Sequence, residues 1–480
     1  MASIWAAQRR RRQVERDAPP IRSVERPGPH PLSPTQRRLW RLERSGVHGG
    51  LAYNVTMARL LHGPLDAVAL REAANEVARR HEALRTVFSE DDGVPGQTVL
   101  TECPPEFTVI NLRGIGPHDR QAAAQRMADT QATRPMDLTA GPPFRVQLLR
   151  LAEDEHVIVV CVHHIVADGW SLQVIVGEMA ALYNARVAGE PPALPEPEFH
   201  LVDVVGWQQA WLRGPTLDRY LKFWRPRRVP VAAALPLAPN LSPPRSEPSA
   251  GHGNRIHFQI PGPTARVLRR LADEAGTTLF GVLLACYALL LYRHGAAHEI
   301  VIGSPAANRN RPELSRVVGY LAHIVPLTVG IDLRDDFRSL LTRVHDTATE
   351  SFAHQALSVE QLVESTDPAA DPVASYPITT LFALHSFHRG DIRLTRLRDE
   401  PYHIVTKDTE FPLSFSVFDT NNALTGYAGH HSGIYPPQQV ARLVDDFLAI
   451  LALVTEHPNL PVRAFAESAA ATTSHDAHYH

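Results

Sequence analysis

The chain has 480 residues, of which 21% are charged and 44% are hydrophobic, and its formal net charge is −3. This length allows more than one hydrophobic core, and the near-neutral charge gives no reason to expect nucleic-acid binding. Three cysteines, an odd number, stand at scattered positions and predict no disulfide framework.

The first 30 residues carry a basic run, Arg9–Arg12, and several prolines, but no apolar stretch of signal-peptide length. This composition disfavours a twin-arginine or mitochondrial address. We therefore predict a flexible basic leader over residues 1–30 and a cytoplasmic protein.

The segment that follows alternates helical and strand patterns. Between Asp66 and Phe88 the apolar residues recur at helical spacing and lead into a strand near Thr86. Two further apolar runs, Phe144–Leu149 and His156–Val162, are separated by an acidic turn and predict a pair of strands. Residues 31–200 are thus expected to form a mixed α/β lobe.

The sequence from His163 to Gly169, His-His-Ile-Val-Ala-Asp-Gly, directly follows the second of these strands. If strand pairing persists through both histidines, their side chains point to opposite faces, so one would be chemical and the other structural. Gly169 can adopt backbone angles closed to other residues. Asp168 could hold the loop through hydrogen bonds or a buried cation.

A helix is predicted directly after this motif, with Ser171 as a plausible N-cap and an apolar face toward the core. Its N-terminus would favour negative charge that develops near the histidines. The alternatives are an adjacent histidine pair that is merely packed or solvated, and a zinc site. The zinc site is disfavoured because adjacent strand residues diverge and no Cys or Glu stands at ligand spacing, so we predict no metal.

Proline-rich stretches mark the middle of the chain, and we assign residues 201–255 to a crossover and connector. Residues 256–466 are expected to form a second lobe, whose elements are a strand near Ile256, helices over Ala265–Glu274 and Leu279–Arg293, a strand at Glu299–Gly303, a half-buried strand at Leu413–Phe418, and a helix over Pro436–Val454. The apolar run Leu279–Tyr292 is shorter than the roughly 20 residues of a membrane span, so no membrane partner is predicted. The polar tail, residues 467–480, is expected to be disordered, with His475, His478 and His480 solvated.

The His-His-x-x-x-Asp-Gly motif resembles that of the condensation domains of nonribosomal peptide synthetases, which belong to the chloramphenicol-acetyltransferase-like acyltransferases. The resemblance extends from about Leu32 to Leu451 and includes further segments in the family's order, namely Leu32–Trp40, Arg80–Phe88, Asp203–Gln208, Ile302–Arg309 and Val318–Tyr320. Departures gather in the C-terminal half: His323 stands where Asn is common, His354–Leu362 lacks a Pro-Phe pair, and Ser375–Ile378 is only faintly similar.

This resemblance implies two α/β lobes arranged as a V-shaped pseudo-dimer with a tunnel between them. It implies that His164 and Gly169 serve catalysis, that His163 holds the loop, and that Asp168 pairs with Arg309 across the lobes. Candidates for the tunnel wall are Trp170, Ser171, Ser304 and His323.

The same resemblance implies acyl or aminoacyl transfer from a carrier-protein phosphopantetheine thioester in natural-product biosynthesis, with no bound cofactor. The implied partners are a donor peptidyl carrier protein and an acceptor, which is either a second carrier protein or a soluble small-molecule nucleophile. An amide or an ester product stays open.

Other members of the superfamily leave alternatives: a coenzyme A-dependent acyltransferase, an epimerase, or a recruitment module without chemistry. The last is disfavoured because such modules usually lose the second His or the Gly of the motif. No adenylation loop or carrier motif is present in the sequence, which leaves an excised domain or a free-standing condensation enzyme, and we expect the latter.

Overall fold

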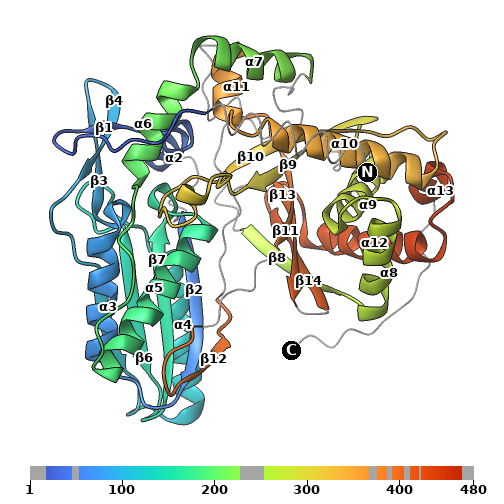
Figure 1. Ribbon diagram of the computed structural model, residues 1–480. Helices are drawn as coiled ribbons and strands as arrows, with labels where there is room; N and C mark the ends of the chain where they lie inside the picture. The colour runs from blue at the N-terminus through green and yellow to red at the C-terminus, as the bar shows by residue number, and fades with distance from the viewer. Residues whose placement is uncertain are drawn as a thin grey trace.

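The computed structural model describes residues 18–45, 53–227, 253–366, 376–385, 392–404, 411–420 and 423–467. Within them the chain forms two α/β lobes, each built on a mixed β-sheet (Figure 1). We call them the N-lobe and the C-lobe. The predicted two-lobed α/β architecture is confirmed.

The N-lobe is built on a five-stranded sheet in the order β12-β2-β7-β6-β5. Its strands are β2 (Asn54–His62), β5 (Glu106–Asn111), β6 (Phe144–Arg150), β7 (Glu155–His163) and β12 (Arg398–Pro401). The helices are α2 (Pro34–Ser45), α3 (Ala67–Arg80), α4 (Pro117–Thr133) and α5 (Gly169–Ala188). A small sheet at its margin joins β1 (His30–Pro31), β4 (Val94–Val99) and β3 (Thr86–Asp91).

Strand β7 is central to the N-lobe because apolar clusters cover both of its faces. Val160 and Val162 pack in the cluster that includes residues of α3 and α5, whereas Val159 and Cys161 pack in the cluster that includes residues of α4. This two-sided burial explains why the strand reads as a continuous apolar run rather than an alternating one. Antiparallel pairing of β6 with β7, as predicted, is confirmed.

The C-lobe is built on a six-stranded sheet in the order β10-β9-β11-β13-β14-β8. Its strands are β8 (Gly253–Ile260), β9 (Glu299–Ala306), β10 (His323–Gly330), β11 (Thr380–His385), β13 (Leu413–Thr420) and β14 (Ala423–His431). Its helices are α8 (Gly262–Glu274), α9 (Leu279–Arg293), α10 (Phe337–Ala353), α11 (Val359–Thr366), α12 (Pro437–Glu456) and α13 (Val462–Glu467).

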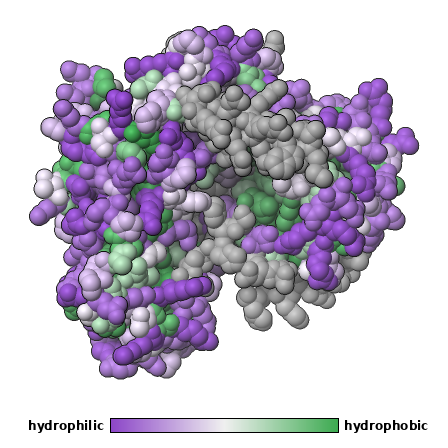
Figure 2. All heavy atoms as spheres, in the orientation of Figure 1, coloured by the Kyte–Doolittle hydropathy of each residue, from purple (hydrophilic) through white to green (hydrophobic). Residues whose placement is uncertain are grey.

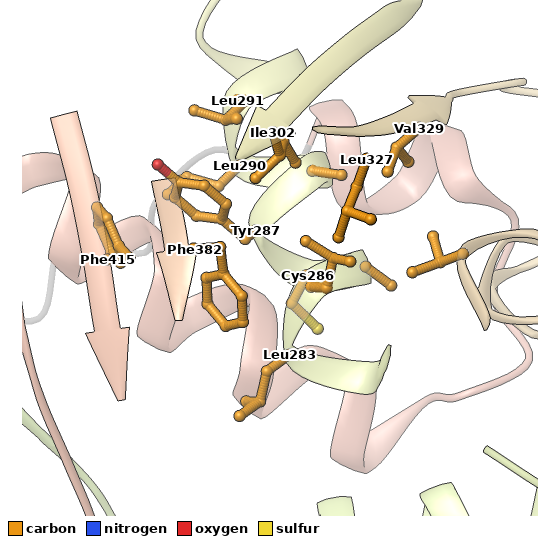
Figure 3. Close-up of a cluster of buried hydrophobic side chains, with 14 of the residues drawn as sticks. Leu283, Cys286, Tyr287, Leu290, Leu291, Ile302, Leu327, Val329, Phe382 and Phe415 are labelled. Carbon is orange, nitrogen blue, oxygen red and sulfur yellow. The ribbon is translucent and has the colours of Figure 1, made fainter. Parts of the chain in front are cut away.

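Helix α9 lies in the centre of the C-lobe core, where the Tyr287 ring packs between Phe382 and Phe415, with ring centroids 5.3 and 4.9 Å away (Figure 3). The prediction of a buried helix is confirmed. In the described residues, no helix taken singly has the length and apolar character needed to cross a membrane, although α8 and α9 pass that test together as a strongly bent pair.

Strand β13 corrects one expectation, because it is buried on both faces rather than one. Phe415 and Val417 face the main core, and Ser414 and Ser416 on the other face are also buried. Their partners in register, Leu381 and Ala383, are themselves buried, and both belong to a second apolar cluster. The small serines therefore lie in a covered face that hydropathy alternation cannot reveal.

The described part of the leader also differs from the prediction. Ala18 and Ile21 are buried in the N-lobe core, and the Arg26 guanidinium forms ion pairs with Asp203 and Glu82. Ala18, Ile21 and Arg26 therefore attach this segment to the N-lobe, although most of its other residues are exposed. Residues 1–17, 228–252 and 468–480 lie outside the described residues, so the rest of the leader, most of the proline-rich connector and the tail histidines are not described.

The division of the chain between the lobes is less simple than the predicted boundaries. Helix α6 (Leu201–Trp211) contributes to the N-lobe core, whereas α7 (Gly214–Trp224) contributes to the C-lobe core. Two later segments return to the N-lobe: Leu314–Leu321 supplies core residues, and β12 adds an edge strand to the sheet by pairing with β2. The two lobes are thus interleaved.

A buried ion pair holds strand β12 on the N-lobe. Nε of Arg59 donates to Oδ2 of Asp399 at 2.6 Å, and both side chains are at most 10% exposed. We expect Asp399→Ala to lower the free energy of unfolding by about 3–5 kcal/mol, because it leaves the buried guanidinium without its charge partner. Urea unfolding measures this change.

A matched control lies on the same strand, where Arg398 and Glu400 form an exposed ion pair. Glu400→Ala should cost at most about 1 kcal/mol, since exposed pairs contribute little. Equal effects of the two alanine variants would contradict the assignment of Asp399 as the anchor of β12.

Candidate active site

The two histidines of the motif occupy different environments because strand β7 ends between them. His163 is the last residue of β7, and His164 begins a short 3₁₀ turn that ends at Val166. His163 is only 1% exposed, whereas His164 is half-buried. Strand pairing thus does not continue through both histidines. The two side chains nevertheless differ as expected, because the imidazole of His163 is enclosed and that of His164 is partly accessible.

The tautomer of His164 follows from its hydrogen bond to the backbone. Its Nδ1 lies 2.8 Å from the carbonyl oxygen of Ala167, which can only accept, so Nδ1 carries the proton. In the neutral ring the other nitrogen, Nε2, can accept a hydrogen bond, and no described residue donates one to it. A neutral imidazole held in this way can take a proton from a nucleophile.

His163 is held on both sides of its ring. Its Nδ1 accepts from the backbone N–H of Ile165 at 3.1 Å, so Nε2 carries the proton and donates to Oε1 of Glu43 at 2.9 Å. Burial lowers the pKa of His163, and the nearby Glu43 carboxylate opposes that shift only in part. The ring is therefore neutral, and it ties the turn to helix α2.

Asp168 lies at the centre of a buried polar cluster that joins the two halves of the chain. Its carboxylate accepts from both terminal nitrogens of Arg309, at 2.7 and 3.0 Å. Backbone N–H groups of Ser171, Leu321 and Ala322 donate to it at 2.8, 3.2 and 2.9 Å. The ion pair expected between Asp168 and Arg309 is present. We call these residues, with Gly319, the Asp168 cluster.

The charge state of Asp168 follows from these contacts. Burial acts to raise the pKa of the carboxyl group, but the positive charge of Arg309 and the hydrogen bonds from Arg309, Ser171 and Ala322 lower it below its ordinary value. Asp168 is therefore ionised at neutral pH. Of the two options left by the sequence, hydrogen bonds and a buried cation, the structure uses both.

Contrary to the prediction from the sequence, Ser171 is not the N-cap of helix α5. The N-cap of α5 is Asp168, because its carboxylate already accepts the N–H of Ser171, and the helix begins at Gly169. Ser171 is fully buried, and its hydroxyl group contacts the backbone N and O of Gly319 at 3.0 and 2.9 Å. Ser304 is only 1% exposed, so neither serine lines an open passage.

Gly169, Trp170 and His323 complete the set of predicted residues. Gly169 is exposed and lacks a positive φ, and a Cβ there would meet nothing within 4 Å, so special backbone angles are not used. Trp170 donates from Nε1 to the Ser315 carbonyl at 2.8 Å and thus joins the two halves. His323 is buried, and burial lowers its pKa to about 4, which makes it neutral.

Two residues contact the histidines although the sequence did not predict either contact. The ring of Tyr320 lies 4.3 Å from that of His164 between centroids, at an interplanar angle of 45°. Glu43 binds His163 from α2. Neither position carries a local signal, because each contact joins residues that are more than 100 positions apart. Within the described residues, no group of three or more His, Cys, Asp or Glu side chains could hold a metal ion.

Comparisons of this chain with a family model and with known proteins agree on one family. The condensation-domain family model matches residues 28–472. One of the linear gramicidin synthase proteins of Brevibacillus parabrevis is 33% identical over 449 residues, which are 93% of this chain and 6% of that protein. Phosphinothricin tripeptide synthetase PhsC of Streptomyces viridochromogenes is 33% identical, over 88% of this chain and 39% of that protein. The chain thus spans a minor part of these relatives.

Solved structures share the fold at lower identity. The X-domain from teicoplanin biosynthesis, solved in complex with OxyB, matches with a TM-score of 0.81 and 24% identity over 93% of this chain and 98% of that chain. SgcC5 of Streptomyces globisporus matches with a TM-score of 0.74 and 22% identity over 90% of this chain and all of that chain. These likenesses establish the fold.

The Asp168–Arg309 contact yields a prediction about stability and its pH dependence. Asp168→Asn should lower the free energy of unfolding by about 3–5 kcal/mol at pH 7, since it leaves Arg309 buried without a counter-charge. The folded pKa of Asp168 lies below its ordinary value of 3.8, so its stabilising contribution is present above that pH and is lost as the pH falls below it.

Unfolding of wild type and Asp168→Asn from pH 7 to pH 2.5 measures both effects, and the difference between them should shrink below about pH 4. Asp332→Asn, at an exposed ion pair with Arg334, provides the control and should unfold like the wild type. A soluble Asp168→Ala protein with wild-type stability would contradict the assigned role.

Proposed function

The chain belongs to the condensation-domain family, and we propose that it is an active acyltransferase that uses His164. In this proposal an acyl or aminoacyl group passes from the phosphopantetheine thioester of a carrier protein to an amine or hydroxyl acceptor. The observation that supports it is a half-buried imidazole whose Nδ1–H is bound by the Ala167 carbonyl and whose Nε2 receives no hydrogen bond from a described residue. An inert module has no need of an imidazole oriented in this way.

The proposed reaction begins when the acceptor nitrogen or oxygen attacks the thioester carbon, and Nε2 of His164 takes the proton that the acceptor releases. The resulting tetrahedral intermediate collapses, the carbon–sulfur bond breaks, and the proton passes to the departing thiolate. An amide or ester and a free phosphopantetheine thiol result. No other co-reactant is needed.

The demand on His164 depends on the acceptor. An α-amino group has a pKa near 8, so about a tenth of it is already unprotonated at neutral pH. For an amine, the imidazole mainly orients the nucleophile and removes a proton from the intermediate. A hydroxyl group ionises far less readily, so general-base help, worth roughly 10²- to 10⁴-fold in rate, matters more for ester formation.

The remaining site residues have supporting roles in this proposal. His163 and the Asp168–Arg309 pair hold the turn that presents His164, and the exposed Gly169 leaves space for the thioester beside it. Trp170 holds the two halves of the chain together through its hydrogen bond to Ser315, and we assign it no role in substrate binding. Carrier proteins would reach the site through the region between the lobes, where hydrophobic residues are visible on the surface (Figure 2).

A second candidate is a recruitment module without chemistry, and the likeness to the teicoplanin X-domain is the observation that favours it. A third is transfer from acyl-coenzyme A. The three are separated by the donor: the proposed enzyme acylates an acceptor from a loaded carrier protein, a coenzyme A enzyme does so from acyl-coenzyme A alone, and a recruitment module does neither.

We predict product formation from acyl-carrier protein at a rate at least tenfold above that from the matched acyl-coenzyme A, because the carrier contributes binding energy of its own. Intact-mass spectrometry of reactions with paired amine and alcohol acceptors gives both the donor and the bond formed. If the wild-type chain leaves every loaded carrier unreacted, the proposal is excluded: product from acyl-coenzyme A would then favour the coenzyme A enzyme, and no product from either donor would favour the recruitment module.

We also predict that His164→Ala lowers the rate of ester formation by about 10²-fold or more and the rate of amide formation by less, because a hydroxyl acceptor needs a general base more than an amine does. Steady-state rates with matched amine and alcohol acceptors measure the two effects. His345→Ala, at a partly buried histidine of α10 in the C-lobe, serves as a control for loss of an imidazole. Small and equal losses with both acceptors would remove His164 from the role of base.

A further inference from the structure

The ring of Tyr320 contacts the imidazole of His164, although the two residues belong to different halves of the chain. Their centroids are 4.3 Å apart and the planes are inclined at 45°. Tyr320 is half-buried and lies in the segment between the short helical turn at Pro312–Leu314 and strand β10. The proposed reaction does not use it directly, so the contact needs its own explanation.

The backbone around Tyr320 is fixed on both sides by the Asp168 cluster. On the preceding side, the N–H of Gly319 donates to Oγ of Ser171 at 3.0 Å. On the following side, the N–H groups of Leu321 and Ala322 donate to Oδ2 of Asp168 at 3.2 and 2.9 Å. These acceptors stand at the start of α5, a few residues after His164, so the same cluster positions both rings.

Close packing adds to these hydrogen bonds. A Cβ placed on Gly319 would lie 2.6 Å from Cδ1 and 3.2 Å from Cβ of Leu201 in α6, so the chain passes close to the N-lobe here and a side chain at this position would require Leu201 to shift. Gly319 and Leu321 are buried, whereas Tyr320 between them is half-buried and reaches His164. The segment is therefore held rigidly with one ring directed at the imidazole.

We propose that Tyr320 is a positioning residue for His164, an inference that rests on the proposed function. Its ring limits rotation of the imidazole, so that Nε2 stays directed at the acceptor while Nδ1 stays on the Ala167 carbonyl. When His164 takes a proton, the π electrons of the same ring stabilise the imidazolium that forms. The Asp168 cluster then serves catalysis by presenting Tyr320 as well as by holding the loop.

Kinetics of Tyr320→Phe and Tyr320→Leu test this role. We expect Tyr320→Phe to retain kcat within about twofold, because the ring is kept, and Tyr320→Leu to lower kcat about tenfold with little change in KM for the loaded carrier. Tyr402→Leu removes a partly buried aromatic ring from the segment after β12 and serves as the matched control, with kcat near the wild-type value.

A double-mutant cycle separates positioning from general loss of structure. In a His164→Ala background, Tyr320→Leu should cause no further loss of kcat, because the ring acts through the imidazole. A tenfold loss that persists without His164 would overturn the proposal, and so would wild-type kcat in Tyr320→Leu.

A readout without catalysis distinguishes failure of this inference from failure of the proposed function. In the NMR spectrum of the wild-type chain, the Cε1–H signal of His164, identified by its disappearance in His164→Ala, should be displaced by the ring current of Tyr320. Tyr320→Leu should abolish that displacement, and Tyr320→Phe should keep it. If the signal is the same in all three proteins, the contact is absent and the inference fails, whatever the activity; a displaced signal in a chain inactive with every donor supports the contact and rejects only the proposed function.

Discussion

The buried ion pair between Asp168 and Arg309 is the interaction on which the rest of the site depends. Both side chains are almost completely enclosed, at 2% and 1% exposure. Enclosing two charges is unfavourable unless each is neutralised by the other and by hydrogen bonds. Here the carboxylate meets that condition only when the start of α5, Arg309 and the segment before β10 are assembled together. Formation of the site is thereby coupled to association of the two halves of the chain.

The turn that carries His164 is held by contacts from two separate parts of the structure. On one side α2 holds it, because Gln36 donates to the Ile165 carbonyl at 3.0 Å and Glu43 accepts from His163. On the other side the Asp168 cluster holds its C-terminal end and places Tyr320 on His164. A three-residue turn has few hydrogen bonds of its own, so its geometry is set by these neighbours. The proton transfer that we propose for His164 needs such rigidity, since proton transfer depends on direction and distance.

The two lobes are also joined at sites away from Asp168, because segments of each half of the chain pack on the other. The C-terminal half gives the N-lobe an edge strand, β12, and core residues between Leu314 and Leu321. Helix α2 in turn contacts α11 through an ion pair between Arg37 and Glu364. Relative movement of the lobes would therefore disturb the contacts of Asp168, four residues after His164, and the contact of Tyr320 with His164 itself.

Local sequence patterns determined several helices, strands and turns of this protein. The apolar run of β7, the His-His-x-x-x-Asp-Gly turn and the helix after it follow from hydrophobic periodicity and turn chemistry, which depend only on neighbours along the chain. The buried α9 helix and the family membership were likewise readable from the sequence.

Tertiary structure alone decided how these pieces became a site. It made Asp168 rather than Ser171 the N-cap, enclosed Ser171 and Ser304, buried Ala18 and Ile21 in the N-lobe core, and brought Tyr320 and Glu43 to the histidines. Each of these outcomes depends on burial or on a hydrogen bond between residues far apart in the chain. Such contacts leave no periodic trace, because a side chain's environment is set by what folds against it and not by its sequence neighbours.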